Sequence, residues 1–328
     1  MLPSGYAARP LEFVDVDGLP DGPDVDLAYA VVSAADVGVI GHAEDSREAI
    51  RANLTNPDAQ RTEHRLVLTD AGEPVGLLVI EKDTATRTFF VDSYAAPSHG
   101  HRVLGGLVAM GTSAAERLRG EGQWNAEAGV FAQDEAYIEI LEAAGFREVR
   151  RFWRMVIDLG PEHEGVPTAP AGVTRTVVAT DDDRRLLHRI DEESFAEHFG
   201  FAPRPYEEFL SWFGGRRDAR TDLWWLAWLD GQPVGLCVMD DSHVERGAGH
   251  VRTLGVLREA RGRGIASWLL HSAFAQAARE GRRAVTLTVD AENTTGATAL
   301  YEGVGMRAEQ VILLYRRPLP PPTGISPA

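Results

Sequence analysis

The sequence predicts an α/β (α+β) fold made of two similar halves in tandem. Three observations support this prediction. Short apolar runs rich in β-branched residues alternate with amphipathic helical patterns along most of the 328 residues. Segments of the first half reappear in the second at an offset of about 160 residues. A segment rich in Gly and Pro, residues 160–172, separates the two halves.

Three pairs of segments carry the repeat, and each pair shares a pattern of turns and apolar residues. They are 70–77 with 230–236, 141–146 with 301–306, and 151–159 with 311–319. The first pair reads as a hairpin turn followed by an apolar strand. We therefore expect a first domain over residues 1–159, a linker over 160–172, a second domain over 173–318 and a flexible tail over 319–328. Residues up to about Pro10 are also expected to be loose.

The second half begins with a strand-like segment, residues 173–178, followed by three aspartates at 181–183 and an amphipathic helix. Negative charge is favourable at a helix N-terminus, so the aspartates indicate the start of that helix. A metal site is the alternative interpretation of the aspartates. Nowhere else does a Cys/His cluster or a carboxylate spacing suggest a metal. Residues 224–229 contain three tryptophans and predict a core strand.

A short basic turn follows a predicted strand over residues 250–256, and a helix is expected to begin near Ser267. The turn consists of Arg261, Gly262, Arg263, Gly264, Ile265 and Ala266. Gly264 has no Cβ, so backbone amides there can approach a bulky anion closely. The two arginines add positive charge, and the helix N-terminus adds free N–H groups and the positive end of its dipole. The sequence therefore predicts a pyrophosphate cradle at this junction, from Arg261 to Ser267.

A second motif follows this helix. Residues 283–290 predict a buried strand, and after it come Asn293 and a helical segment that ends in Leu300 and Tyr301. Together with the Arg-x-x-Gly-x-Ala spacing of the basic turn, this pattern resembles the GNAT acetyltransferases. The tandem arrangement resembles that of mycothiol synthase-like proteins. The resemblance implies two GNAT domains, each a mixed, mostly antiparallel twisted sheet flanked by helices.

The resemblance also implies that the second domain binds acetyl-CoA in a splay between two parallel strands. The pantetheine arm would pair with Leu254, Gly255 and Val256, and the pyrophosphate would occupy the basic turn. Asn293 would contact amide groups of acetyl-CoA. The alternative role for Asn293 is to cap the following helix, which is a common use of Asn at such a position.

The chemistry that the resemblance implies is direct attack of an amine on the thioester. Tyr301, with an ordinary pKa of about 10, would donate a proton to the departing thiolate; packing in the core is the alternative. The family's base lies eleven residues before the motif, where this sequence has His250 instead of the usual Glu. A pKa near 6.5 suits that role. Glu245, Asp240, Asp290 and an ordered water chain are the alternatives.

Residues 192–206 occupy the region that GNAT proteins use to shape the acceptor pocket. Glu193, Glu197 and His198 would meet a cationic amine there, and a solvated helix face is the alternative interpretation. The resemblance predicts an acetyl-CoA-dependent N-acetyltransferase that acts on a primary amine of a small molecule. Acetylation of a protein N-terminus or lysine is a second hypothesis, and a non-catalytic acyl-CoA sensor is a third.

The first half departs from the second where the chemistry would take place. The aligned pairs are His99 for Arg261, Arg102 for Gly264, Gln133 for Asn293 and Leu141 for Tyr301. A side chain at position 102 would occupy the space of a phosphate, and the proton donor is missing. We therefore expect a degenerate first domain that keeps the fold without catalysis.

Composition restricts the class of protein. The net charge is −16, with 44% hydrophobic and 25% charged residues, as in globular proteins. Such a charge disfavours nucleic acid and anionic membranes and mildly attracts cationic acceptors. No segment has the length of a transmembrane helix or the pattern of a signal peptide, and the single cysteine, Cys237, excludes an intrachain disulfide. We expect a cytoplasmic protein, either a monomer whose halves form a pseudo-dimer or a weak homodimer.

Overall fold

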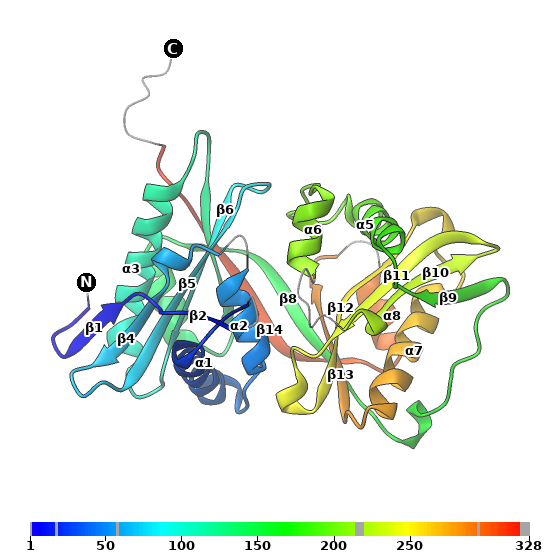
Figure 1. Ribbon diagram of the computed structural model, residues 1–328, viewed down its shortest axis with the longest axis horizontal. Helices are drawn as coiled ribbons and strands as arrows, with labels where there is room; N and C mark the ends of the chain where they lie inside the picture. The colour runs from blue at the N-terminus through cyan, green and yellow to red at the C-terminus, as the bar shows by residue number, and fades with distance from the viewer. Residues whose placement is uncertain (1, 17–18, 57–58, 214–219, 294–295, 322–328) are drawn as a thin grey trace, which may run out of the picture. The chain divides into compact units, whose positions relative to one another are not determined.

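The computed structural model describes residues 2–16, 19–56, 59–213, 220–293 and 296–321 (Figure 1). Contacts divide the chain into two compact units. Unit 1 comprises the residues up to Arg151 and those from Val311 onward, and unit 2 runs from Phe152 to Gln310. Each unit has a mixed, mostly antiparallel sheet with helices packed on it, which confirms the predicted fold class.

Unit 1 has a sheet in which β6 and β7 are parallel and the other described neighbours are antiparallel. In order across the sheet, its strands are β1 (Tyr6–Arg9), β4 (Arg65–Thr69), β5 (Pro74–Asp83), β6 (Thr88–Ala95), β7 (Asn125–Phe131) and the part of β14 (Arg307–Pro318) that begins at Val311. A small hairpin, β2 (Val14–Val16) with β3 (Leu19–Asp21), lies outside this sheet.

Helices of unit 1 pack on both faces of its sheet because side chains alternate along each strand. On β4, Leu66 packs in the cluster formed with α1 (Pro23–Ile40) and α2 (Arg47–Thr55), whereas its neighbour Val67 packs in the cluster formed with α3 (Gly100–Leu118) and α4 (Glu135–Ala143).

The prediction that the first ten residues are loose is wrong. Strand β1 pairs along its whole length with β4, with Tyr6 opposite Thr69 and Arg9 opposite Leu66. The Arg9 guanidinium also donates two hydrogen bonds, of 2.5 and 2.7 Å, to the carboxylate of Asp24 at the start of α1. Sequence polarity alone did not indicate that these residues form an edge strand.

Unit 2 repeats the same plan. In order across its sheet, the strands are β8 (Arg147–Asp158) from Phe152 onward, β13 (Ala284–Asp290), β12 (Ala248–Val256), β11 (Gln232–Asp240), β10 (Trp224–Leu229) and β9 (Val173–Val177). Its helices are α5 (Asp181–Phe195), α6 (Tyr206–Phe213), α7 (Ile265–Arg279) and α8 (Ala297–Gly303). Among the described pairs of this unit, β12 and β13 are parallel and the others antiparallel.

Short 3₁₀ helices connect several of these elements. They are η1 (Arg61–Glu63), η2 (Pro161–His163), η3 (Thr221–Leu223), η4 (Val244–Arg246) and η5 (Arg258–Ala260).

The aspartates at 181–183 begin α5 as predicted. Thr180 Oγ1 accepts a hydrogen bond from the Asp183 amide at 3.1 Å, and the Asp183 carboxylate accepts one from the Thr180 amide at 2.8 Å. This capping box satisfies two amides at the helix N-terminus and contributes about 1 kcal/mol.

The last strand of each half of the sequence joins the sheet of the other half. Residues 152–158 of β8 pair with β13 of unit 2, and residues 312–318 of β14 pair with β7 of unit 1. The compact units are therefore not the continuous segments 1–159 and 173–318 that the sequence suggested. Local sequence patterns identify both strands but do not specify which sheet each strand joins.

The internal repeat is otherwise visible residue by residue. Both predicted hairpins are present, β4 with β5 and β10 with β11. Gly76 lies opposite Ala95 in unit 1, and Gly235 lies opposite Val256 in unit 2. Leu141 occupies the position of Tyr301. The Leu141 carbonyl accepts a hydrogen bond of 3.0 Å from the Phe146 amide, and the Tyr301 carbonyl accepts one of the same length from the Met306 amide.

The expected tail begins later than residue 319. Leu319 is buried in the core of unit 1, and its amide donates to the Trp124 carbonyl at 2.8 Å. Residues 322–328 lie outside the described part of the chain. The linker over 160–172 contains η2, and its Pro167 carbonyl accepts a hydrogen bond from Trp268 Nε1 on α7 at 3.2 Å.

Candidate active site

A cavity opens in unit 2 where β12 and β13 separate. The two strands pair only from Ala248 opposite Ala284 to Val251 opposite Leu287. Beyond that point they border a cavity of about 570 Å³, which residues 254–256 of β12 and 288–290 of β13 line. On its other side β12 continues to pair with β11, and no described strand pairs with the edge of residues 254–256 that faces the cavity.

The basic turn lies at the end of this cavity. Gly262 and Gly264 have φ angles of 75° and 77°, a left-handed conformation that favours glycine. Gly264 is the N-cap of α7, which begins at Ile265, two residues earlier than the sequence indicated. The first helical hydrogen bond runs from the Trp268 amide to the Gly264 carbonyl. Within the described structure, the amides of residues 265–267 have no acceptor, which is the geometry of an anion site at a helix N-terminus.

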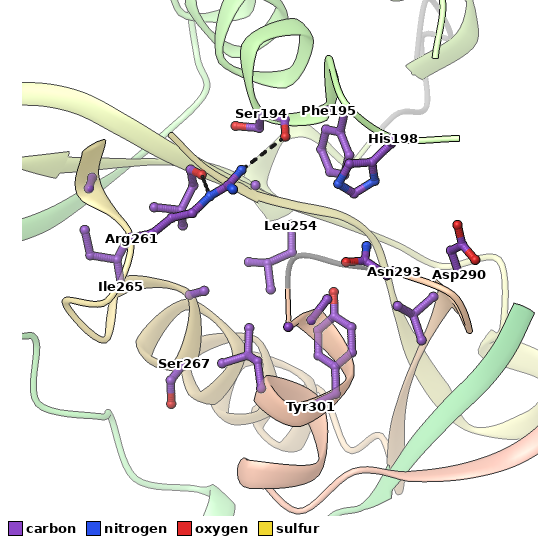
Figure 2. A pocket seen from close by; sticks show the side chains of 18 of the residues that line it. Ser194, Phe195, His198, Leu254, Arg261, Ile265, Ser267, Asp290, Asn293 and Tyr301 are labelled. Atoms are coloured by element: carbon purple, nitrogen blue, oxygen red, sulfur yellow. Dashed lines mark hydrogen bonds between the residues drawn. The ribbon is translucent and has the colours of Figure 1, made fainter. Parts of the chain in front are cut away.

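The side chain of Arg261 does not extend into the turn. Its guanidinium donates to the Val256 carbonyl at 3.0 Å and to the Ser194 carbonyl at 3.4 Å. Figure 2 shows the contact between Arg261 and Ser194. It therefore ties the turn to the end of β12 and to α5. Arg263 is exposed and does not line the cavity. The anion-binding character of the turn thus rests on backbone amides more than on the two arginines.

Tyr301 lies on α8 with 8% of its surface exposed. Its hydroxyl points toward the middle of the cavity, between Leu254 and Asn293 (Figure 2). That hydroxyl has no hydrogen-bond partner among the residues that the structure describes. Burial raises the pKa of Tyr301 to about 12, and the nearby Cys237 adds to the rise. The tyrosine therefore keeps its proton at neutral pH and is able to donate it.

Asn293 lies in the segment between β13 and α8 and lines the cavity. Its backbone amide donates to the Asp290 carbonyl at 3.1 Å. The N-cap of α8 is Gly296, so the alternative interpretation of Asn293 as the cap of that helix is wrong.

Helix α5 forms the opposite wall of the cavity, and it packs very closely on β12. A Cβ placed on Gly255 would lie 2.9 Å from Ser194 Cβ and 3.3 Å from Phe195 Cε2. Ser194 is 6% exposed, and its hydroxyl has no partner among the described residues. A bound ligand would satisfy this hydroxyl. Ser194 and Phe195 were not singled out from the sequence, although with His198 they follow the spacing of one helical face.

The proposed acceptor residues separate in the structure. His198 lines the cavity beside Phe195, with ring centroids 4.7 Å apart, and burial followed by the Arg261 charge lowers its pKa. Glu193 is exposed and pairs with Arg189 at 3.2 Å, as expected for a solvated helix face.

His250 lies on β12 outside the cavity lining. Its Nδ1 is 3.0 Å from Thr286 Oγ1, and its ring centroid is 4.3 Å from that of His243. Burial, partly offset by the neighbouring Asp240, lowers the pKa of His250 to about 4. It is therefore a neutral and weakly basic side chain within a buried network.

The structure brings most of the predicted site residues into one cavity. Those that line it are Leu254, Gly255, Val256, Arg261, Gly262, Gly264, Ile265, Ala266, Ser267, Asn293, Tyr301 and His198. The predicted residues outside the lining are Arg263, His250 and Glu193.

Unit 1 lacks the corresponding turn. Its strand β6 ends at Ala95 and α3 begins at Gly100, so four residues replace the eight that separate β12 from α7. The N-cap of α3 is His99, at a φ of −123°, and Arg102 is already inside the helix. The counterpart of Gly264 is therefore His99, which corrects the alignment with Arg102.

No group of residues suited to bind a metal ion is present among the described residues, and none of the helices they form is long and apolar enough to cross a bilayer. Cys237 is fully buried, and burial raises the pKa of its thiol to about 12. Such a thiol is unreactive at neutral pH.

Comparison with known proteins agrees with this geometry. Residues 185–306 match the model of the acetyltransferase (GNAT) family. The mycothiol acetyltransferase of Streptomyces griseus is 30% identical over 226 residues, which cover 66% of this chain and 67% of that protein. The chain belongs to the GNAT acetyltransferase family. GNAT proteins are N-acyltransferases that use acyl-CoA donors.

Solved structures show that the GNAT resemblance extends over both units. A GCN5-related N-acetyltransferase from Sphaerobacter thermophilus has a TM-score of 0.76 and 27% identity, with 99% of each chain covered. A tandem GNAT protein from the clavulanic acid biosynthesis pathway has a TM-score of 0.74 over 96% of this chain and 99% of its own. Its 17% identity shows the fold alone.

Proposed function

We propose that this protein is an acetyl-CoA-dependent N-acetyltransferase that acylates a primary amine of a small molecule at the cavity of unit 2. One observation carries the proposal: the splayed strands, the free amides at 265–267 and the Tyr301 hydroxyl border the same cavity. The family provides the acyl-CoA donor, and the name of the Streptomyces griseus relative favours acetyl transfer.

Each part of the cavity has a proposed role in holding the donor. The amides of residues 265–267 bind the pyrophosphate, and the unpaired edge of residues 254–256 hydrogen-bonds the pantetheine arm. Asn293 and the Ser194 hydroxyl supply further hydrogen bonds to amide groups of the donor. These contacts fix the thioester next to Tyr301, and such fixed geometry lowers the entropic part of the barrier.

The reaction then proceeds by direct attack. The neutral amine nitrogen bonds to the thioester carbonyl carbon, the C–S bond breaks, and the electron pair leaves with the sulfur. Tyr301 donates its proton to the thiolate and regains one from the nitrogen that has just been acylated. General acid catalysis of this kind typically contributes about 10²–10⁴-fold to the rate.

The acceptor class rests on two observations. The net charge of −16 favours encounter with cationic molecules. The relative whose name refers to mycothiol is an acetyltransferase named for a small molecule. Acetylation of a protein N-terminus or lysine is the second hypothesis, and an acyl-CoA sensor without catalysis is the third.

The test is to measure free-thiol release from acetyl-CoA in the presence of amines of three kinds: aminosugars, polyamines and short peptides with free N-termini. We expect release with at least one small amine and none with peptides. Release only with peptides would favour the second hypothesis. Tight acetyl-CoA binding, measured by calorimetry, without release for any amine would favour the sensor.

A further inference from the structure

Asp191 lies on the face of α5 that packs on β12, one turn before Ser194. Its carboxylate accepts a hydrogen bond from Thr253 Oγ1 at 3.3 Å. The next contact along the same two elements is the close approach of Gly255 to Ser194 and Phe195, which line the cavity. Helix and strand thus run side by side, and Asp191 lies one helical turn before the lining residues of α5 without being one of them.

That position coincides with the point where the sheet opens. Pairing of β12 with β13 stops at Val251, and cavity lining on β12 starts at Leu254. Between them the pairing of β12 with β11 shifts register, because Thr253 lies opposite Val238 and Val251 lies opposite Met239. Thr253 therefore belongs to a bulge directly before Leu254, the first lining residue of β12, and its hydroxyl holds the Asp191 carboxylate there.

We propose that Asp191 is the general base that removes the proton from the ammonium form of the acceptor amine. The inference rests on the proposed function and assigns to α5 the step that the sequence assigned to His250. The bond between the proton and the amine nitrogen breaks, its electron pair stays on nitrogen, and the proton moves to the carboxylate. Asp191 later releases this proton to water, while the second amine proton returns to Tyr301 after acyl transfer.

The surroundings of Asp191 suit this role. Burial raises the pKa of its carboxyl to about 7, the Thr253 hydrogen bond opposes the rise, and Glu192 adds to it. A base is most effective when its pKa lies near the working pH. Other charged or titratable side chains on α5 and on the elements packed against it are His188 and the exposed pair Arg189 and Glu193 on α5, Cys237 and Asp240 on β11, His250 and Arg252 on β12, and Glu207 and Glu208 on α6.

His250 is less suited to the same step. Its pKa of about 4 makes it a weaker base than Asp191, and its Nδ1 is already within hydrogen-bond distance of Thr286 Oγ1, beside the His243 ring. The two residues are therefore distinguishable by the pH at which activity is lost.

The experiment is a profile of kcat/KM against pH for the full-length protein and four variants, with the amine that the wild type accepts. For the wild type we expect activity to fall on the acid side with an apparent pKa near 7. D191N should lose about 100-fold or more at pH 7. Its defect should shrink as the pH approaches the pKa of the acceptor amine, because a neutral amine needs no base. Its affinity for acetyl-CoA should not change.

The acid limb is the fall of kcat/KM at low pH. T253V should move it to higher pH, because the substitution removes the hydrogen bond that stabilises the charged Asp191 carboxylate. The control is D182N, an exposed aspartate in the first turn of the same helix, which should leave the profile unchanged. H250Q should keep the acid limb.

Three results would overturn the assignment: D191N retaining both the rate and the acid limb, D191N losing the same fraction of activity at every pH, or H250Q removing the limb. A wild-type protein that releases no thiol with any amine would instead refute the proposed function. No general base would then be needed.

Discussion

Replacing Gly264 with valine tests the anion cradle directly. Gly264 has a φ of 77°, where an L-residue costs about 1–2 kcal/mol. A Cβ at this position would meet only Pro170 Cγ at 3.7 Å, which is an ordinary contact. We therefore expect G264V to fold with a modest loss of stability, and the turn to relax toward negative φ and move the amides of residues 265–267.

The expected loss of binding is much larger than the loss of stability. A hydrogen bond to a charged group contributes about 1.5–3 kcal/mol. Misplacing two of the three free amides should then cost about 3–6 kcal/mol, or roughly 10²–10⁴-fold in affinity for acetyl-CoA. Isothermal titration calorimetry measures this affinity, and thermal unfolding measures stability on the same samples.

The matched control is G281V, just beyond the other end of α7. Gly281 has a φ of 74°, and a Cβ added there would have no atom within 4 Å, so the backbone cost should be similar. Its distance along the helix leaves the cradle intact, and acetyl-CoA affinity should stay at the wild-type value. A G264V protein that is folded and binds acetyl-CoA within about threefold of the wild type would refute the reasoning, since threefold is under 1 kcal/mol.

Three further outcomes are expected. Y301F should lower kcat by about 10²-fold or more in steady-state kinetics while the Kd of acetyl-CoA changes little, because the proton donor is lost but the ring remains. Calorimetric titration of the wild type should give one acetyl-CoA per chain, because unit 1 has a four-residue connection in place of the turn. Stability in urea should fall by about 3 kcal/mol between pH 6.5 and pH 4 through His64 alone, and H64N should remove that part of the pH dependence.

The sign of the last effect follows from burial. His64 is fully buried in unit 1, its Nδ1 accepts a hydrogen bond from the Ile80 amide, and burial lowers its pKa to about 4. Its contribution is complete above the unfolded pKa of about 6.5 and is lost as the pH falls through about 4.

Each of these three outcomes has a clear contradiction. Unchanged kcat in Y301F would make Tyr301 a packing residue. Two acetyl-CoA molecules per chain would show that unit 1 also binds the donor. Equal slopes of stability against pH in wild type and H64N would show that His64 does not cause the pH dependence.

Prediction from the sequence was most accurate for features that a few neighbouring residues determine. A glycine that needs a left-handed backbone, a helix N-terminus and a β-branched strand are each encoded within a few residues, so the turn at 261–266 and the helix after it were predicted within two residues. The face of α8 that carries Tyr301 followed from its motif in the same way.

Sequence reasoning failed where a property depends on distant packing. The Arg261 side chain binds carbonyls of Val256 and Ser194, and the second of these is far away in sequence. The raised pKa of Asp191 comes from burial against β12, which no local pattern reports. The mismatch at Arg102 arose because the connection in unit 1 is four residues shorter, so an ungapped alignment displaces the start of the helix that follows.

The exchange of β8 and β14 makes the two halves of the gene depend on each other during evolution. Neither half encodes a self-sufficient sheet, because each half supplies the closing strand of the other. A recombination event that deleted one half would also remove the last strand of the sheet in the other. Selection on the half that carries the Tyr301 cavity therefore also preserves its companion, because the companion supplies a strand of the same sheet.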